Sequence, residues 1–110
     1  MFVDLGAERL IAATKGAQKI AVEIKTFMGR SDIADLEQAV GQFVIYQALL
    51  RKVEPDRTLY IAVPVDVVNT LFQEAIGDAV REAALTHLIA FSPENEEIVQ
   101  WLPEPNTQTL

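Results

Sequence analysis

Five side chains in the first half of the sequence have types and spacings that suit metal-assisted cleavage of a phosphodiester. Asp4 and Glu23 supply carboxylates, and Lys25 lies two residues after Glu23. Residues two apart on a strand point to the same face, so Glu23 and Lys25 are predicted neighbours. Gln42 and Tyr46 are four residues apart, which places both on one face of a helix.

The two carboxylates indicate a magnesium site. Asp4 and Glu23 are hard oxygen ligands that, together with the carbonyl group of Ile24 and water molecules, suit Mg²⁺. A bound Mg²⁺ lowers the pKa of a coordinated water and offsets charge on a phosphate. Lys25 can then orient that water or stabilise the developing negative charge. We expect Asp4, Glu23 and Lys25 to be catalytic, with the two acids as metal ligands.

The predicted helix adds two polar side chains to this set. Gln42 is expected to support catalysis, and Tyr46 is expected to position the substrate. Gly41 precedes them, and a glycine inside a helix is unfavourable by roughly 1 kcal/mol relative to alanine. It indicates either close packing at this point or a backbone that lies near a site.

Each of these residues also has a simpler interpretation. Glu23 and Lys25 can form a salt bridge on a solvated strand face, and Asp4 can cap a turn. Gln42 and Tyr46 can be ordinary boundary residues, with the tyrosine hydroxyl bonded to the backbone. The single histidine, His87, and the single tryptophan are expected to be structural, with Trp101 filling the core or the edge of the sheet.

A hairpin positions the acid–lysine pair. Residues 8–14 and 19–25 read as strands joined by a turn at 15–18, where Gly16 can adopt positive φ. Val22 and Ile24 alternate with Glu23 and Lys25, so they point to the opposite face. We expect the second strand to be central, with helices on both sides. Charges there would need partners or a cleft.

The remaining elements alternate between helices and strands. Ser31 is a predicted helix N-cap, and Asp66 is predicted to cap a second helix that extends to residue 84. Apolar runs predict strands at 58–63, 87–91 and 97–102. The order β-β-α-β-α-β-β predicts an α/β protein of the α+β kind, with a mixed sheet and helices packed on it.

Length and composition place all of this in one domain. The chain has 110 residues, half of them hydrophobic, and contains no cysteine. Residues 1–102 are the predicted domain and 103–110 a predicted disordered tail. No apolar run is long enough to cross a membrane, and the amino-terminal residues do not resemble a signal peptide. We therefore expect a cytoplasmic protein.

Charge is distributed unevenly along the chain. The net charge is −7, which argues against nucleic-acid binding, because such proteins are usually basic. Residues 1–30 nevertheless carry +2, and residues 31–110 carry −9. One face can therefore be locally positive. Ordinary variation of the surface explains the same numbers, so DNA stays an open partner.

The order of the chemical residues resembles a known superfamily. An aspartate, then Glu-x-Lys, then Gln-x-x-x-Tyr on the next helix is similar to the PD-(D/E)-x-K nucleases. A finer resemblance is to the fdxN element excision controlling factors of the XisH type. It covers nearly the whole chain, in ordered blocks: DLGAE (4–8), KIAVEIKTF (19–27), GQF…Y (41–46), LYIAVP (59–64) and IVQW (98–101).

This resemblance implies a fold, an activity and partners. It implies a restriction-endonuclease-like core and Mg²⁺-dependent endonuclease activity on DNA. XisH-type proteins are implicated in programmed excision of a DNA element in cyanobacteria, alongside a site-specific recombinase and the small protein XisI. A toxin–antitoxin or restriction-associated nuclease would share the same residues. The alternative is a catalytically inactive accessory protein that binds the recombinase or an XisI-type partner.

The chain departs from the family at its amino end. Family members usually begin earlier, with a helix and a strand that carry a Gly-Trp-x-Ile-Thr-x-Asp-Pro-like block. Here the first residue lies immediately before the Asp4 strand. We expect the missing elements to leave apolar surface exposed, and homo-oligomerisation to be one way to cover it.

Overall fold

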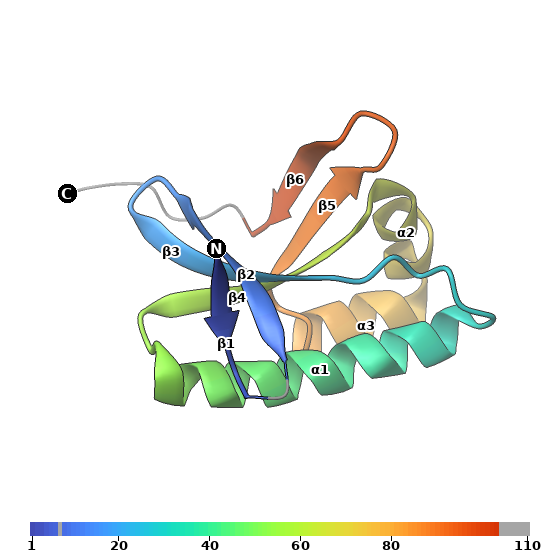
Figure 1. The fold of residues 1–110 in the computed structure, drawn as a ribbon. Coiled ribbons are helices and arrows are strands. Elements are labelled where there is room, and N and C mark those ends of the chain that lie inside the picture. Colours follow the sequence, from blue (N-terminus) through green and yellow to red (C-terminus); the bar gives the residue numbers. More distant parts are fainter. Residues whose placement is uncertain (7, 104–110) are drawn as a thin grey trace.

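One twisted sheet of six strands runs through the molecule in sequence order (Figure 1). The computed structural model describes residues 1–6 and 8–103. Its strands are β1 (Phe2–Asp4), β2 (Arg9–Lys15), β3 (Gln18–Ile24), β4 (Arg57–Pro64), β5 (Leu88–Ser92) and β6 (Glu97–Leu102). Its helices are α1 (Asp32–Val53), α2 (Val65–Asn69), the short 3-10 helix η1 (Leu71–Gln73) and α3 (Ala75–Ala83).

The sheet is mixed, as the sequence predicts. Strands β3, β4 and β5 are parallel neighbours, whereas β1, β2 and β6 pair antiparallel with theirs. The predicted hairpin is β2–β3, and Gly16 in its turn has a φ of 60°. The α+β class is therefore confirmed. The order of elements differs from the predicted one in two places. Strand β1 adds an antiparallel strand before the hairpin, and the predicted second helix is divided into α2, η1 and α3.

The helices cover one face of the sheet, not both. Figure 1 shows α1 and α3 on the same side. Alternate residues of β4 explain the division: Leu59 and Ile61 belong to the core beneath the helices, while Tyr60 belongs to a smaller cluster on the other face. The expectation of helices on both sides is wrong. Val22 and Ile24 line a hollow on the open side, whereas the charge of Glu23 acts on Tyr46 of α1.

Helix α1 begins where its sequence predicts. The Ser31 hydroxyl accepts a hydrogen bond from the N–H group of Ala34 at 3.2 Å, which satisfies a free donor of the first turn. Asp32 and Asp35 lie in that turn, where the helix dipole favours negative charge. The face toward the sheet is buried through Leu36, Ala39, Phe43, Tyr46 and Leu50.

The predicted continuous helix over 66–84 is wrong, and side chains explain the break. The Thr70 hydroxyl donates to the carbonyl of Asp66 at 2.7 Å, and Gln73 Nε2 donates to the carbonyl of Val68 at 3.1 Å. These bonds satisfy carbonyls at the end of α2 and allow the chain to turn. Asp66 lies in the first turn of α2, with Pro64 at the N-cap.

A second apolar cluster lies on the open face of the sheet. Tyr60 and Trp101 meet edge to face with centroids 5.2 Å apart, and His87 contacts Tyr60 in the same way at 5.2 Å. Burial lowers the pKa of His87. These contacts agree with the structural roles expected for His87 and Trp101. A shallow apolar hollow of about 590 Å³ lies over this cluster.

The last strand is an edge strand with a bulge. Ala90 pairs with Gln100, but the next residue, Phe91, pairs with Ile98, so Val99 is an extra residue in β6. Pro103 follows the strand, and the rest of the predicted tail, 104–110, lies outside the described residues. Among the residues that the structure describes, no helix is long and apolar enough to cross a membrane.

Candidate functional site

Glu23 lies among charges near the carboxyl end of β3. Its side chain is half-buried, and burial raises the pKa of its carboxyl group. The negative charge of Glu8 raises this pKa further, while the positive charge of Lys25 lowers it. The carboxylates of Glu8 and Glu23 and the ammonium group of Lys25 thus interact electrostatically on the face of the sheet that α1 covers. Repulsion between the acids is a force that a bound cation would relieve.

Lys25 follows the end of β3 directly and contacts α1. Its backbone N–H group extends the pairing of β3 with β4 by donating to the carbonyl of Ala62 at 2.9 Å. Its ammonium Nζ donates to Oε1 of Gln38 at 3.2 Å. The strand therefore sets the position of Lys25, and the helix orients its charged end on the same side as Glu23.

Tyr46 connects the helix to the acids. Its hydroxyl group has two polar side chains as neighbours, Glu8 and Gln42. Burial raises the pKa of Tyr46, the charges of Glu8 and Glu23 raise it further, and Gln42 lowers it. The helix face predicted from the four-residue spacing therefore does reach Glu23.

Gln42 leaves one polar atom without a partner. Its Oε1 is buried and accepts no hydrogen bond within residues 1–6 and 8–103. A buried acceptor without a donor costs roughly 1–3 kcal/mol, so such atoms often mark a position that a ligand or ion fills. This oxygen is a further hard donor next to Tyr46 and the acids.

Asp4 is engaged in a turn. Its Oδ1 accepts a hydrogen bond from the N–H group of Gly6 at 2.7 Å, and Gly6 has a φ of 98°. The N–H group of Leu5 donates to the carbonyl of Glu8 at 2.8 Å, which brings the chain back toward β2. Asp4 thus fits its simpler interpretation as a turn residue, and its binding of a metal stays a prediction. The same turn presents Glu8 to Glu23.

The donor set suits a cation that keeps most of its water. Among the described residues, no group of three or more His, Cys, Asp or Glu side chains lies close enough to share one ion. Mg²⁺ usually takes only one or two carboxylates and completes its shell with water and phosphate oxygens. Glu8 and Glu23, with the free oxygen of Gln42, satisfy that smaller requirement.

The loop after Lys25 is held in a fixed path. Phe27 has a φ of 56°, a left-handed conformation that costs a side-chain-bearing residue free energy. Its ring packs edge to face on Phe72 with centroids 6.4 Å apart. The N–H group of Gly29 donates to Oδ2 of Asp35 at 3.0 Å. A hollow of about 170 Å³ lies between this loop and α1, beside Lys25 and Gln38.

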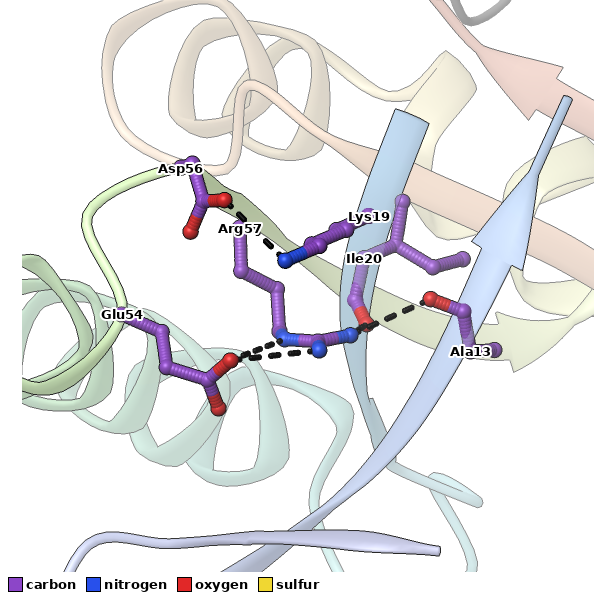
Figure 2. Close-up of polar contacts among 6 residues, drawn as sticks. All are labelled: Ala13, Lys19, Ile20, Glu54, Asp56 and Arg57. Atoms are coloured by element: carbon purple, nitrogen blue, oxygen red, sulfur yellow. Dashed lines mark hydrogen bonds and ion pairs between the residues drawn. The ribbon is translucent and has the colours of Figure 1, made fainter. Parts of the chain in front are cut away.

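A second polar cluster lies at the other end of the same strands (Figure 2). The guanidinium group of Arg57 donates to the carbonyl of Ile20 at 2.8 Å and to that of Ala13 at 3.2 Å. It also forms an ion pair with Glu54 at 3.2 Å. Nearby, Lys19 and Asp56 pair at 3.3 Å. Arg57 therefore ties the hairpin to the end of α1.

Comparison with known proteins decides the family. The family model described as XisH protein matches residues 1–99, which is most of the chain. The chain belongs to the XisH family. No match was found among curated proteins.

Two solved XisH-family structures share this fold. The XisH family protein from Nostoc punctiforme PCC 73102 is 34% identical with a TM-score of 0.82, and the match covers 93% of this chain and 82% of that one. A fdxN element excision controlling factor protein from Anabaena variabilis is 39% identical with a TM-score of 0.81, covering 93% and 81%. The XisH fold predicted from the ordered sequence blocks is therefore confirmed.

Three residues of these polar clusters escape prediction from the sequence. From the sequence, Glu8 looks only like the first residue of a strand. It lies fifteen residues before Glu23, and this separation spans one hairpin, so the two acids lie at the same end of the hairpin. Gln38 lies one helical turn before Gln42, and that spacing was the available signal. Arg57 shows no signal, because its bonds reach carbonyls of distant strands.

Proposed function

We propose that this XisH-family protein hydrolyses phosphodiester bonds of DNA with Mg²⁺, using the site around Glu23, during excision of a DNA element. The observation that supports this most directly is the setting of the half-buried Glu23, which has the like charge of Glu8 acting on it and Lys25 bound to α1 beside it. Such an arrangement is unfavourable without a cation and is typical of sites that bind one. A core of the restriction-endonuclease type is part of the proposal.

The metal ligands are Glu23 and an acid from the turn at residues 4–8. Glu8 is the acid whose charge acts on Glu23, and Asp4 is the acid expected from the motif. A bound Mg²⁺ would supply an acidified water and neutralise charge on the phosphate. Glu23 and its partner would hold the ion, with the Gln42 oxygen as a further donor to it or to its water.

Lys25 acts on the reacting groups. Its ammonium group, bound to Gln38, lies on the side of the sheet where Glu23 points. From there it can hold the attacking water by a hydrogen bond or stabilise charge that develops on the phosphate oxygens. Tyr46 positions this set, because its hydroxyl has Glu8 and Gln42 as polar neighbours. Tyr46 is therefore proposed as a positioning residue.

Cleavage of supercoiled and single-stranded DNA in the presence of Mg²⁺ tests the proposal. We expect Glu23→Gln and Lys25→Ala each to lower the rate about 10²–10⁴-fold, the usual effect of losing a catalytic group. Arg81→Ala on α3 is the matched control for the loss of a positive charge and should keep the rate. Equal cleavage by the parent and both site variants would refute the assignment.

The two candidate acids are separated by a pair of variants. Asp4→Asn and Glu8→Gln each remove one charge from the turn. If Glu8 is the ligand, Glu8→Gln abolishes the stabilisation of the protein by Mg²⁺ in thermal denaturation, and Asp4→Asn retains it. The reverse result assigns the ion to Asp4.

A non-catalytic role is the second candidate, and one observation favours it. Within the part of the chain that the structure describes, three acidic or histidine ligands do not gather anywhere. An accessory protein would act through a site-specific recombinase or an XisI-type protein. Affinity capture of these partners distinguishes the accessory role from the catalytic one. The accessory role is supported if the parent protein and Glu23→Ala capture the partners equally well and neither cleaves DNA. DNA cleavage that Glu23→Ala abolishes rejects it.

A further inference from the structure

Helix α1 is apolar on two opposite faces. Its inner face is buried against the sheet, as described above. Its outer face carries Val44 and Ile45, which are 55% and 57% exposed, together with Ile33 and Leu49. No charged residue occurs between Glu37 and Arg51. A surface helix normally turns charged residues to solvent, and a helix that is apolar all round is normally buried all round.

The centre of the outer face is built from small residues. Ala34, Gly41 and Ala48 recur every seven residues, so they lie along one line of the helix. Among the described residues, nothing lies within 4 Å of the place where a Cβ of Gly41 would be. Packing within the chain therefore does not require this glycine, which is unfavourable inside a helix. A small residue there does allow another helix to approach closely.

The charges of α1 are divided between its ends. Asp32, Asp35 and Glu37 lie in its first two turns, and Arg51 and Lys52 lie in its last turn. A second copy of α1 packed antiparallel would bring acidic residues opposite basic ones at both ends. A parallel copy would place like charges together. The charge pattern thus matches one occupant, the same helix in the opposite direction.

We propose that this protein forms a two-fold symmetric dimer through the outer faces of α1, packed antiparallel and centred between Val44 and Ile45, so that Gly41 lies opposite Ala48 of the partner subunit. In this arrangement Ala34 lies near the C-terminal part of the other helix, and Glu37 faces Lys52 of the partner subunit. An isologous contact of this kind repeats every favourable pair twice. Val44 and Ile45 are buried against their counterparts.

The contact is small and its strength is correspondingly limited. A helix of 22 residues is about 33 Å long, so the interface lies near the lower end of specific interfaces, at roughly 1,200 Å² in total. We expect a reversible dimer with a dissociation constant in the micromolar range. Dimerisation through α1 requires neither metal nor DNA.

The open face of the sheet is the rival surface. Its hollow of about 590 Å³ is lined by apolar residues such as Ile20 and Trp101, with Lys15 at its rim. Nothing in its composition selects a second copy over another occupant. Charge reversal on α1 should weaken a dimer that forms through α1, but not one that forms through the open face of the sheet.

Sedimentation velocity over a concentration series tests the dimer. The full chain is compared with Glu37→Lys and Lys52→Glu, each of which turns both symmetric contacts repulsive. We expect each single variant to weaken dimerisation about tenfold. An equimolar mixture of the two variants restores complementary pairs and should dimerise like the parent chain. The double variant, with both reversals in one chain, should also dimerise.

Two further variants separate folding from association. Gly41→Leu keeps the monomer folded, because the side chain extends into space free of described residues, but it should abolish the dimer. Ile76→Lys on α3 removes an exposed apolar residue elsewhere and should leave the dimer intact. Circular dichroism checks that each variant is folded. A parent chain that stays monomeric, a dimer insensitive to the reversals, or a mixture that fails to recover would each overturn the proposal.

Discussion

The two ends of strand β3 carry polar clusters of opposite character. At its amino end, Arg57 is only 10% exposed, yet its guanidinium group has partners on every side: Glu54 and the carbonyls of Ala13 and Ile20 (Figure 2). Near its carboxyl end, Glu23 is also partly buried. Among the described residues its carboxylate forms no ion pair and accepts no hydrogen bond.

This difference separates structure from proposed function. A charge with all its partners stabilises the fold and needs nothing from outside. A carboxylate without a hydrogen bond or ion pair, near a like charge and only partly offset by Lys25, is stabilised further when a cation binds. The unsatisfied cluster lies toward the carboxyl ends of the parallel strands β3 and β4, where open sheets of this kind commonly bind ligands.

The largest effect is expected at the satisfied cluster. Arg57→Met keeps an apolar stem but removes the donors to two strand carbonyls and leaves Glu54 unpaired. We expect a loss of about 2–4 kcal/mol in the free energy of unfolding, measured by urea denaturation. DNA cleavage by the folded fraction should be unchanged. A stable Arg57→Met protein would mean that this cluster is not an anchor.

A smaller effect is expected at the residue that joins the two acids to the helix. Tyr46→Phe removes a hydroxyl group that has Glu8 and Gln42 as polar neighbours, and should lower the free energy of unfolding by at most about 1 kcal/mol. Because Tyr46 is a positioning residue, the same variant should weaken stabilisation by Mg²⁺ in thermal denaturation. Unchanged stabilisation by Mg²⁺ would show that the hydroxyl group serves the fold alone.

A gain in stability is expected at Glu23. Burial and Glu8 raise the pKa of Glu23 above its unfolded value. Between the two pKa values the folded protein binds more protons than the unfolded chain, so this group lowers stability as the pH rises through that window. Without metal, Glu23→Gln should therefore raise the melting temperature at pH 7.

The pH dependence of that gain provides its own control. As the pH falls toward about 4, Glu23 becomes protonated in both states and the advantage of Glu23→Gln should disappear. Glu82→Gln on α3 removes one negative charge elsewhere and should change the melting temperature little. A lower melting temperature for Glu23→Gln at neutral pH would show that Glu23 is a satisfied structural residue after all.

The smallest effect is expected beside Arg57. Lys19 and Asp56 form an ion pair, but their side chains are 50% and 64% exposed. Exposed pairs are screened by water and salt and contribute little to stability. Lys19→Met should therefore leave urea denaturation almost unchanged, in contrast with Arg57→Met. An effect as large as that of Arg57→Met would mean that the whole cluster acts as one unit.

The sequence predicts local structure well where the determinants are local. The Ser31 cap and the Gly16 turn follow from residue types within a few positions, and both are found. The second helix is different, because its apolar stripe continues across the break. Hydrogen bonds from the Thr70 and Gln73 side chains to backbone carbonyls interrupt the helix, and the four-residue apolar repeat gives no indication of these bonds. The one-sided arrangement of helices likewise depends on how distant segments pack.

The candidate site shows the same limit. Spacing alone places Glu23 with Lys25 and Gln42 with Tyr46, and the structure brings these pairs to one region. The acid beside them is Glu8, because a turn of the chain, absent from any motif, presents it to Tyr46. Asp4, which the motif favours, lies on the edge strand β1 and bonds to Gly6. Long-range contacts of this kind carry no sequence signature.

The bulge at Val99 affects how readily copies of this protein aggregate through their sheet edges at high concentration. An edge strand with exposed Ile98 and Val99 is a template for strand addition and, in crowded conditions, for fibril growth. The extra residue breaks the regular spacing of free backbone groups, and Glu96 and Glu97 add repulsion at one end. At the opposite edge, β1 offers only three residues. Both margins of the sheet are therefore poor nuclei for aggregation.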